Sequence, residues 1–473
     1  MLRRHQVRVV GGGLRVVTMC FLLVFVVGQA GPPSPADEWT MAIADARKLP
    51  VEVAKYTRYL TLFAVPIEDR EPWYTILTFH LWSISREAEP SKPRRISPTL
   101  YAIYLPDFGI EPTTYGRLTY RDPYFHVALT ADGKRPINEV PSPAPWVGTV
   151  TAQDELRKLT YSQSPLLRAD WFVVETSIQD GRGDAKTGTG YYSFIGVTDR
   201  AGFQKAVGAD PKLADELKRR IRAIVKESGV SYFPRQIERM DALGGGYWFT
   251  LDVLDEGKGN RNPLRQLDRE YKHQAEEHYA IGPAGMPWFL LCDQDGKLQN
   301  SAPDKLGPDT TRTGRRKIID VGASCVRCHK EILRPIDSWI SEALKAPATA
   351  EIDYKQAIET RRLYFRDLQG KLKRDREAFA ERLLECNGLT PAKNSELYIR
   401  LWDQYSEARL TLADCARELG CSPRRLAEVL IVVQDQKKLD PVLVDLLQPK
   451  GNVRREMWEE VYPIAQAYIG GKP

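Results

Sequence analysis

The chain has 473 residues, of which 42% are hydrophobic and 27% are charged, and its formal net charge is +6. At about 100 to 200 residues per domain, this length predicts two to four domains with buried cores, which excludes a minimal single-domain carrier. Positive and negative residues alternate along most of the chain. That pattern is typical of a solvated surface and argues against nucleic acid as a partner.

Residues 1–30 have the order of a secretory signal peptide. Four arginines and no acidic residue precede an apolar run at 16–27, which ends in small residues near Ala30. The run is shorter than the roughly 20 residues that cross a bilayer, so we expect cleavage near Ala30, with an uncleaved anchor as the alternative. Removal of the four arginines lowers the net charge from +6 to +2. We expect a periplasmic or otherwise exported protein with no membrane span after cleavage.

The segment 36–240 is predicted to be a mixed α and β domain. Some of its stretches are amphipathic with helical spacing, whereas others are rich in β-branched and aromatic residues. The predicted helices are 39–48, 51–63, 73–84 and 214–228. The predicted strands are 100–105, 171–176 and, just beyond this segment, 247–254.

The second predicted unit, 241–345, contains a Cys-x-x-Cys-His motif at 325–329. A hairpin is expected at 287–298, turning on 293–296. Two aspartates and a glycine in this turn suggest calcium, but an EF-hand loop needs oxygen ligands at positions 1, 3 and 5 and glycine at position 6. The register is wrong for that loop, so we predict an ordinary turn.

The third predicted unit, 346–473, is all-helical, which makes the fold class α+β. Gly420 suits the left-handed residue that ends a helix. A helix, a glycine-containing turn and a second helix at 411–431 have the order of a DNA-binding motif. Export and near-neutral charge favour a packed helical hairpin instead. The predicted helices are 354–385, 395–407, 411–419, 422–434 and 454–469.

The motif at 325–329 carries the clearest chemistry in the chain. The thiols of Cys325 and Cys328 have the spacing that adds to the two vinyl groups of haem, and His329 then reaches the iron as proximal ligand. A zinc or redox Cys-x-x-Cys site is the alternative, but it lacks a second Cys or His pair at suitable spacing. We therefore predict one covalently bound haem c.

The sixth iron ligand can be His, Met, water or nothing. His273, His278 and Met286 lie nearest the motif in sequence, beside aromatic residues that could wall an apolar pocket, namely Tyr279, Trp288 and Phe289. The full set of candidates after the leader is His80, His126, His273, His278, Met41, Met240, Met286 and Met457.

Several short motifs resemble a family of large exported bacterial proteins with a single late Cys-x-x-Cys-His, described only as cytochrome c-like. They are the segments 167–173, 271–277, 287–293, 301–303, 321–325 and 412–420, so the likeness spans most of the mature chain. His273 matches a histidine of the family pattern, and the resemblance therefore implies His273 as the distal ligand. Methionine at Met286 departs from that pattern and stays an alternative ligand.

Four further cysteines follow the leader, Cys292, Cys386, Cys415 and Cys421. In an oxidising compartment they allow zero, one or two disulfides. Cys415 and Cys421 lie on either side of Gly420 and are the pair most easily joined, with free buried thiols as the alternative.

The sequence thus predicts an electron-transfer protein with an unidentified redox partner protein. A haem enzyme, peroxidase-like or substrate-oxidising, and a haem-based sensor or interaction protein are the alternatives. No Ser-His-Asp set, carboxylate pair or nucleotide loop stands out, so no catalytic residue is predicted.

Overall fold

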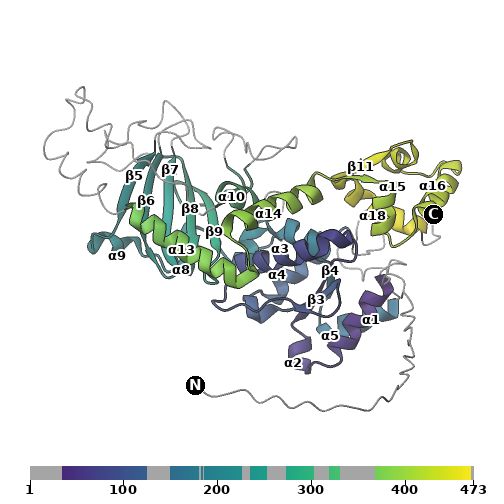
Figure 1. The fold of residues 1–473 in the computed structure, drawn as a ribbon, viewed down its shortest axis with the longest axis horizontal. Coiled ribbons are helices and arrows are strands. Elements are labelled where there is room, and N and C mark those ends of the chain that lie inside the picture. Colours follow the sequence, from purple (N-terminus) through teal and green to yellow (C-terminus); the bar gives the residue numbers. More distant parts are fainter. Residues whose placement is uncertain are drawn as a thin grey trace, which may run out of the picture. The chain divides into compact units, whose positions relative to one another are not determined.

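The structure is a computed structural model that describes residues 35–124, 150–179, 183–184, 186–225, 235–252, 273–302, 319–330 and 368–469. Within these ranges helices and strands are mixed along the first two thirds of the chain and helices dominate the last (Figure 1). The predicted α+β class is confirmed. The predicted signal peptide at 1–30 lies outside the described residues.

The first sheet has four strands in the order β2-β3-β1-β4. Its strand β1 (Thr57–Thr61) pairs antiparallel with β3 (Leu100–Tyr104) and parallel with β4 (Leu166–Arg168), and all five residues of β1 are buried. Tyr59 packs with residues of α1 and α5, whereas Leu60 joins the main core with α3 and α6. Helices therefore cover both faces of this sheet.

The other elements of this region are α1 (Pro35–Ala46), α2 (Val51–Ala54), η1 (Ile67–Asp69), α3 (Arg70–Ser83), β2 (Arg94–Arg95), η2 (Leu105–Phe108), α4 (Pro112–Gly116), η3 (Arg117–Tyr120), α5 (Val150–Thr160), α6 (Ala169–Thr176) and α7 (Tyr191–Ile195). The predicted helices at 39–48 and 73–84 and the strand at 100–105 are confirmed. The helix at 51–63 is wrong beyond Ala54, where β1 follows. The strand at 171–176 is wrong because these residues form α6.

The second sheet is an antiparallel meander of five strands in the order β5-β6-β7-β8-β9. Its strands are β5 (Ile221–Val225), β6 (Arg235–Ala242), β7 (Gly245–Asp252), β8 (Ala275–Ile281) and β9 (Pro287–Asp293). The strand at 247–254 and the hairpin at 287–298 are confirmed. Asp293 accepts hydrogen bonds from the backbone of Asp295 and Lys297, and Gly296 has φ +81°, so the segment that suggested calcium is a turn.

The second sheet differs from the sequence predictions at two places, the helix 214–228 and the domain boundary after residue 240. The helix at 214–228 is wrong because α9 (Pro211–Glu216) ends early, Lys218 has φ +55°, and β5 follows. The predicted domain boundary between 240 and 241 falls inside β6, and the boundary at 345 lies outside the described residues. By its contacts the chain from Ser34 onward is one compact unit.

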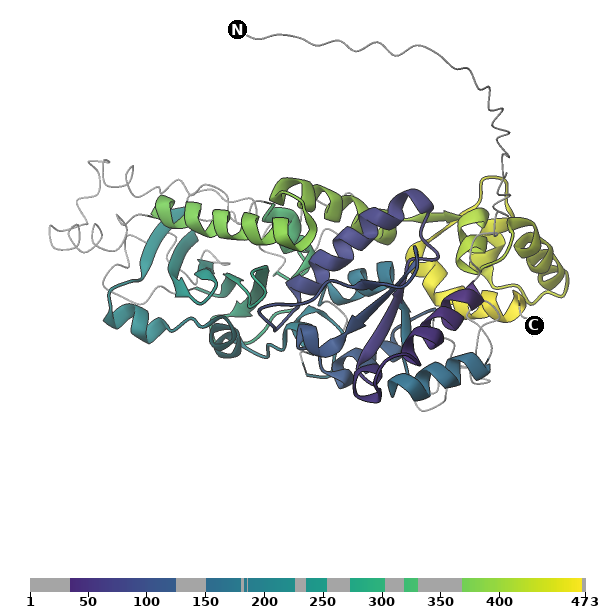
Figure 2. The same cartoon turned by 60° about the horizontal axis from the view of Figure 1, so that its bottom comes forward.

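Helices cover both faces of the five-stranded sheet (Figure 2). On one face α13 (Leu368–Asn387) places Asp375 within hydrogen-bond distance of Trp248 and Arg239. On the other face α8 (Arg200–Val207) packs Phe203 against the rings of Tyr247 and His278. Because neighbouring residues of a strand point to opposite faces, each strand contributes side chains to two separate environments.

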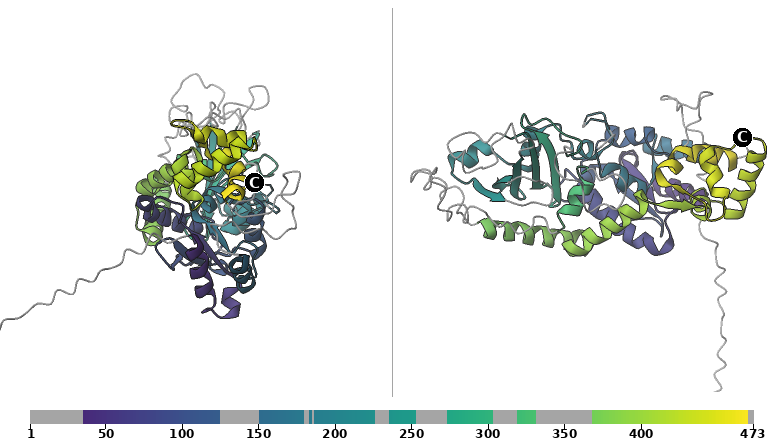
Figure 3. Two further views of the ribbon diagram at one scale, coloured as in Figure 1. Left: turned by 90° about the vertical axis from the view of Figure 1, so that its right-hand side faces the viewer. Right: turned by 90° about the horizontal axis from the view of Figure 1, so that it is seen from above.

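The last described segment, 368–469, is helical apart from a short ladder between β10 (Arg409–Thr411) and β11 (Asn452–Arg454). Figure 3 shows the yellow C-terminal helices gathered together. Gly420 has φ +67°, as predicted, and ends α15, while Leu426 and Leu430 of α16 are buried in the core, so 411–431 is a packed helical hairpin. Besides α13, the helices of the segment 368–469 are α14 (Pro391–Ser406), α15 (Leu412–Glu418), α16 (Pro423–Asp435), α17 (Pro441–Val444), η5 (Asp445–Leu447) and α18 (Arg455–Ile469).

Among the helices of the described ranges, none combines the length and apolar composition that crossing a membrane requires.

Candidate functional site

The Cys-x-x-Cys-His motif occupies the short helix α10 (Ala323–Cys328) and the residue after it. The helix begins where Gly322, at φ +89°, turns the chain and the backbone N–H of Ala323 donates to the carbonyl of Ser177 at 2.8 Å. Residues three apart share one side of a helix, so the thiols of Cys325 and Cys328 lie on the same side. Cys325 is buried and Cys328 half-buried.

The two residues between the cysteines fix α10 to α14. Arg327 is 1% exposed, pairs with Asp403 and lies 4.9 Å from the ring of Trp402. The hydroxyl of Ser395 donates to the carbonyl of Val326 at 3.3 Å. These contacts anchor the motif on α14, and sequence patterns do not predict them because they join distant segments.

His329 lies against strands β8 and β9, as the predicted pocket wall requires. Its ring centroid is 5.9 Å from that of Tyr279 and 5.5 Å from that of Phe289, two residues that are paired across the strands. Its Nε2 lies 3.4 Å from Oε1 of Glu277. Trp288, the third predicted wall residue, lies on the opposite face, where it contacts Phe203.

Glu277 connects His329 to a buried arginine. Arg235 donates to Oε2 of Glu277 at 2.7 Å and to Oδ1 of Asp252 at 2.5 Å. Burial alone would raise the pKa of Glu277, but the charge of Arg235 and the hydrogen bond with His329 hold that pKa below its usual value. The carboxylate therefore stays ionised beside the imidazole, and neither Glu277 nor Arg235 was predicted.

His273, the predicted distal ligand, is not brought to His329. Its Nε2 lies 2.7 Å from Oε1 of Glu276, which points to the opposite face of β8 from Glu277. Met286 is fully buried in the hydrophobic core at the turn before β9. The assignment of either residue to iron stays a prediction, and the geometry does not favour His273.

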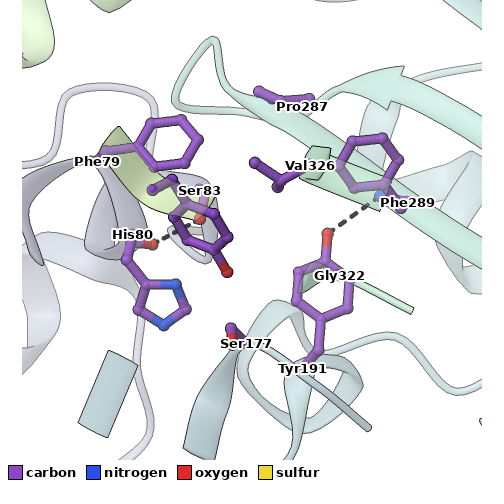
Figure 4. Close-up of a pocket in the computed structure, with 10 residues that line it drawn as sticks. Phe79, His80, Ser83, Ser177, Tyr191, Pro287, Phe289, Gly322 and Val326 are labelled. Atoms are coloured by element: carbon purple, nitrogen blue, oxygen red, sulfur yellow. Dashed lines mark hydrogen bonds between the residues drawn. The ribbon is translucent and has the colours of Figure 1, made fainter. Parts of the chain in front are cut away.

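A small cavity lies beside α10 (Figure 4). It measures about 10 Å³, which is room for about one water molecule. Val326 and Gly322 line it from the motif side, and His80 lines it from α3. The Nε2 of His80 lies 2.6 Å from the hydroxyl of Thr176, and burial lowers the pKa of His80 to about 3, so this histidine is neutral at physiological pH.

The opposite face of the second sheet carries a cluster that was not predicted, formed by Glu276, His278 and Cys292. Glu276 and His278 are two apart in β8, a spacing that places both on one face. Cys292 joins them only through the register of the hairpin, in which it pairs with Glu276. Sequence spacing could have suggested the first two residues but not the third.

No disulfide forms among Cys292, Cys386, Cys415 and Cys421, which are all free thiols. The pair Cys415–Cys421 is thus not joined, and the alternative of free thiols is the one found. Burial raises the pKa of the Cys415 thiol, which keeps it protonated.

The donor set of α10 fits a covalently bound haem. It offers two thiols on one side of a helix, an imidazole on the next residue and two aromatic rings beside that imidazole. No protein-family model, no curated protein and no solved structure matches this chain.

Proposed function

We propose that the protein is an exported c-type cytochrome that transfers electrons through one haem bound to Cys325 and Cys328. The observation that carries the proposal is the Cys-x-x-Cys-His motif on an anchored helix, with His329 packed against the aromatic rings of Tyr279 and Phe289 and beside the carboxylate of Glu277. Haem bound in this way supplies one-electron redox chemistry. The leader at 1–30 supports export, because haem attachment takes place outside the cytoplasm.

The protein's own residues have separable roles in this proposal. The two thiols would hold the group covalently, and His329 would bind its iron. Glu277, itself held by Arg235, places a negative charge beside the imidazole of His329. Arg327 anchors α10 to α14 through its ion pair with Asp403.

A haem enzyme or sensor is the second candidate, favoured by the separation of His273 from His329. If no strong ligand fills the sixth position, small molecules can bind the iron there. Carbon monoxide distinguishes the two functions, because it binds ferrous haem quickly only where the sixth position is open or weakly occupied.

The proposal is tested by producing the full chain in cells that attach haem c and staining a denaturing gel for haem. We expect a stained band for the wild-type protein, none for the double variant Cys325→Ala/Cys328→Ala, and an unchanged band for the matched control Cys386→Ala, a buried cysteine of α13. His329→Ala should keep a covalent adduct but change its ferric spectrum. A wild-type band without haem would overturn the proposal.

A further inference from the structure

The cluster of Glu276, His278 and Cys292 has the composition and geometry of a metal site. The Nε2 of His278 lies 2.8 Å from Oε2 of Glu276 and 3.2 Å from Sγ of Cys292, and Sγ lies 3.2 Å from the same Oε2. All three residues are at most 3% exposed. Three different donor atoms therefore converge on one point in the interior, on the opposite face of the sheet from His329.

The imidazole of His278 is oriented as a metal ligand would be. Its Nδ1 lies 2.6 Å from the hydroxyl of Tyr247, which in turn accepts a hydrogen bond from Gln204 at 3.1 Å. This outer contact directs Nε2 toward Glu276 and Cys292. Histidines that bind metals are usually fixed in this way through their second ring nitrogen.

The two carboxylate oxygens of Glu276 have different partners. Arg200 donates to Oε1 at 2.5 Å, and Nε2 of His273 lies 2.7 Å from the same oxygen. Oε2 is thus the oxygen that faces His278 and Cys292. The guanidinium of Arg200, which is 32% exposed at its side chain, balances the buried carboxylate from outside the cluster.

We propose that Oε2 of Glu276, Nε2 of His278 and Sγ of Cys292 bind one Zn²⁺ ion. A mixed set of oxygen, nitrogen and thiolate donors suits zinc. A tetrahedral zinc ion separates its ligand atoms by roughly 3.3 to 3.6 Å, so the three atoms need to part by only about half an ångström. His273, whose Nε2 lies 2.7 Å from Oε1 of Glu276, is a further side chain that could complete the set.

Binding is balanced by the release of one proton. The thiol of Cys292 loses its proton to solvent as the sulfur–zinc bond forms, and Glu276 binds as the carboxylate. The thiolate and the carboxylate together offset the charge of the ion, and the guanidinium of Arg200 remains as a positive charge at the edge of the site. No oxidant or reductant is needed.

The test uses the full-length protein after treatment with EDTA and its removal. Titration with Zn²⁺ against a chromophoric chelator should give one ion per chain, and Co²⁺ should give a thiolate-to-metal absorption band. Cys292→Ser should lower the Zn²⁺ affinity at least tenfold and abolish the band. The matched control Cys386→Ser, at a fully buried cysteine far along the sequence, should leave both unchanged.

Circular dichroism and thermal unfolding establish that each variant is folded. If Cys292→Ser fails to fold, His278→Gln is measured in its place with the same expected loss. The site is wrong if wild-type protein binds no Zn²⁺ at micromolar concentration or if the band survives in the folded variant. A band lost instead in Cys325→Ala/Cys328→Ala would place the ion at α10 and overturn this site, whereas a missing haem stain alone leaves it intact.

Discussion

Glu277 is a charged side chain that contacts the imidazole of His329. Its carboxylate lies 3.4 Å from Nε2 of the imidazole and is held by Arg235. Charge next to an axial histidine is one of the factors by which a protein sets the reduction potential of haem. The residue therefore offers a way to alter the proposed redox centre without touching the attachment motif.

We predict that Glu277→Gln raises the midpoint potential of the haem, because loss of a negative charge disfavours the ferric state. The expected shift is about 50 mV, where 59 mV corresponds to a tenfold change in a one-electron equilibrium. Arg235 keeps its bonds to Asp252, so folding should persist. Redox titration is the measurement. Glu52→Gln, at a side chain 78% exposed, is the control, and an unchanged or lowered potential in Glu277→Gln would contradict the prediction.

The buried imidazole of His80 should make the free energy of unfolding depend on pH. Burial lowers its pKa to about 3, whereas in the unfolded chain it titrates near 6.5. Below pH 6.5 only the unfolded state gains the proton, so stability is fully present above that pH and falls by about 1.4 kcal/mol per pH unit down to about pH 3.

His80→Gln should remove this dependence while keeping a polar group near Thr176. We expect the difference in unfolding free energy between wild type and variant to narrow by about 3 kcal/mol from pH 7 to pH 4. Urea unfolding at both pH values measures it. A constant difference would show that His80 does not titrate as its burial implies.

At the scale of elements, α10 owes its position to one glycine. Gly322 has φ +89°, and a Cβ there would lie 2.2 Å from the carbonyl oxygen of Ser177. An L side chain is strained in this conformation, and the clash is with backbone, which cannot move aside without displacing α6 or α10.

Gly322→Ala should therefore destabilise the protein by about 2 to 4 kcal/mol and reduce haem attachment. Gly116→Ala is the matched control, because that glycine has an ordinary φ and nothing within 4 Å of the added carbon. Thermal unfolding and the haem stain report the two effects. Equal behaviour of the two variants would contradict the role of Gly322.

The elements also show where sequence patterns stop being informative. Every residue of α6 is buried, so 171–176 has no polar face to reveal a helix, and its aromatic and β-branched residues suggested a strand. At 214–228 the helical pattern is interrupted by Lys218 at φ +55°, after which β5 pairs with β6. Local spacing cannot predict either outcome, because burial and strand pairing decide both.

In the candidate site, too, some features can be predicted from the sequence and others depend on contacts between distant segments. The motif at 325–329 can be recognised because its residues are adjacent in sequence. Of the three aromatic residues expected near it, Tyr279 and Phe289 contact His329. The roles of Glu277, Arg235 and Asp403 depend on contacts between distant segments. In β8, adjacent residues serve opposite faces: Glu276 faces the proposed zinc ligands, and Glu277 faces His329.

At the scale of the whole molecule, one hydrophobic cluster extends from Leu60 in β1 to Ala465 in α18. A buried ion network reinforces it across a long sequence separation. Arg168 at the end of β4 lies 2.9 Å from Glu418 in α15, and Arg455 of α18 lies 2.8 Å from the same carboxylate. The N-terminal sheet and the C-terminal helices are thus joined through one glutamate.

We predict that Glu418→Gln lowers the free energy of unfolding by about 3 to 5 kcal/mol, because the variant leaves two buried guanidinium groups without their shared counter-ion. The loss should appear in a single transition, since the network ties the first sheet to the last helices. Glu428→Gln removes an exposed i,i+4 pair with Arg424 and should cost at most about 0.5 kcal/mol. Calorimetry on both variants measures the difference. If Glu418→Gln instead produced a separate early transition confined to the C-terminal helices, the network would stabilise only that region and the two ends of the chain would unfold independently.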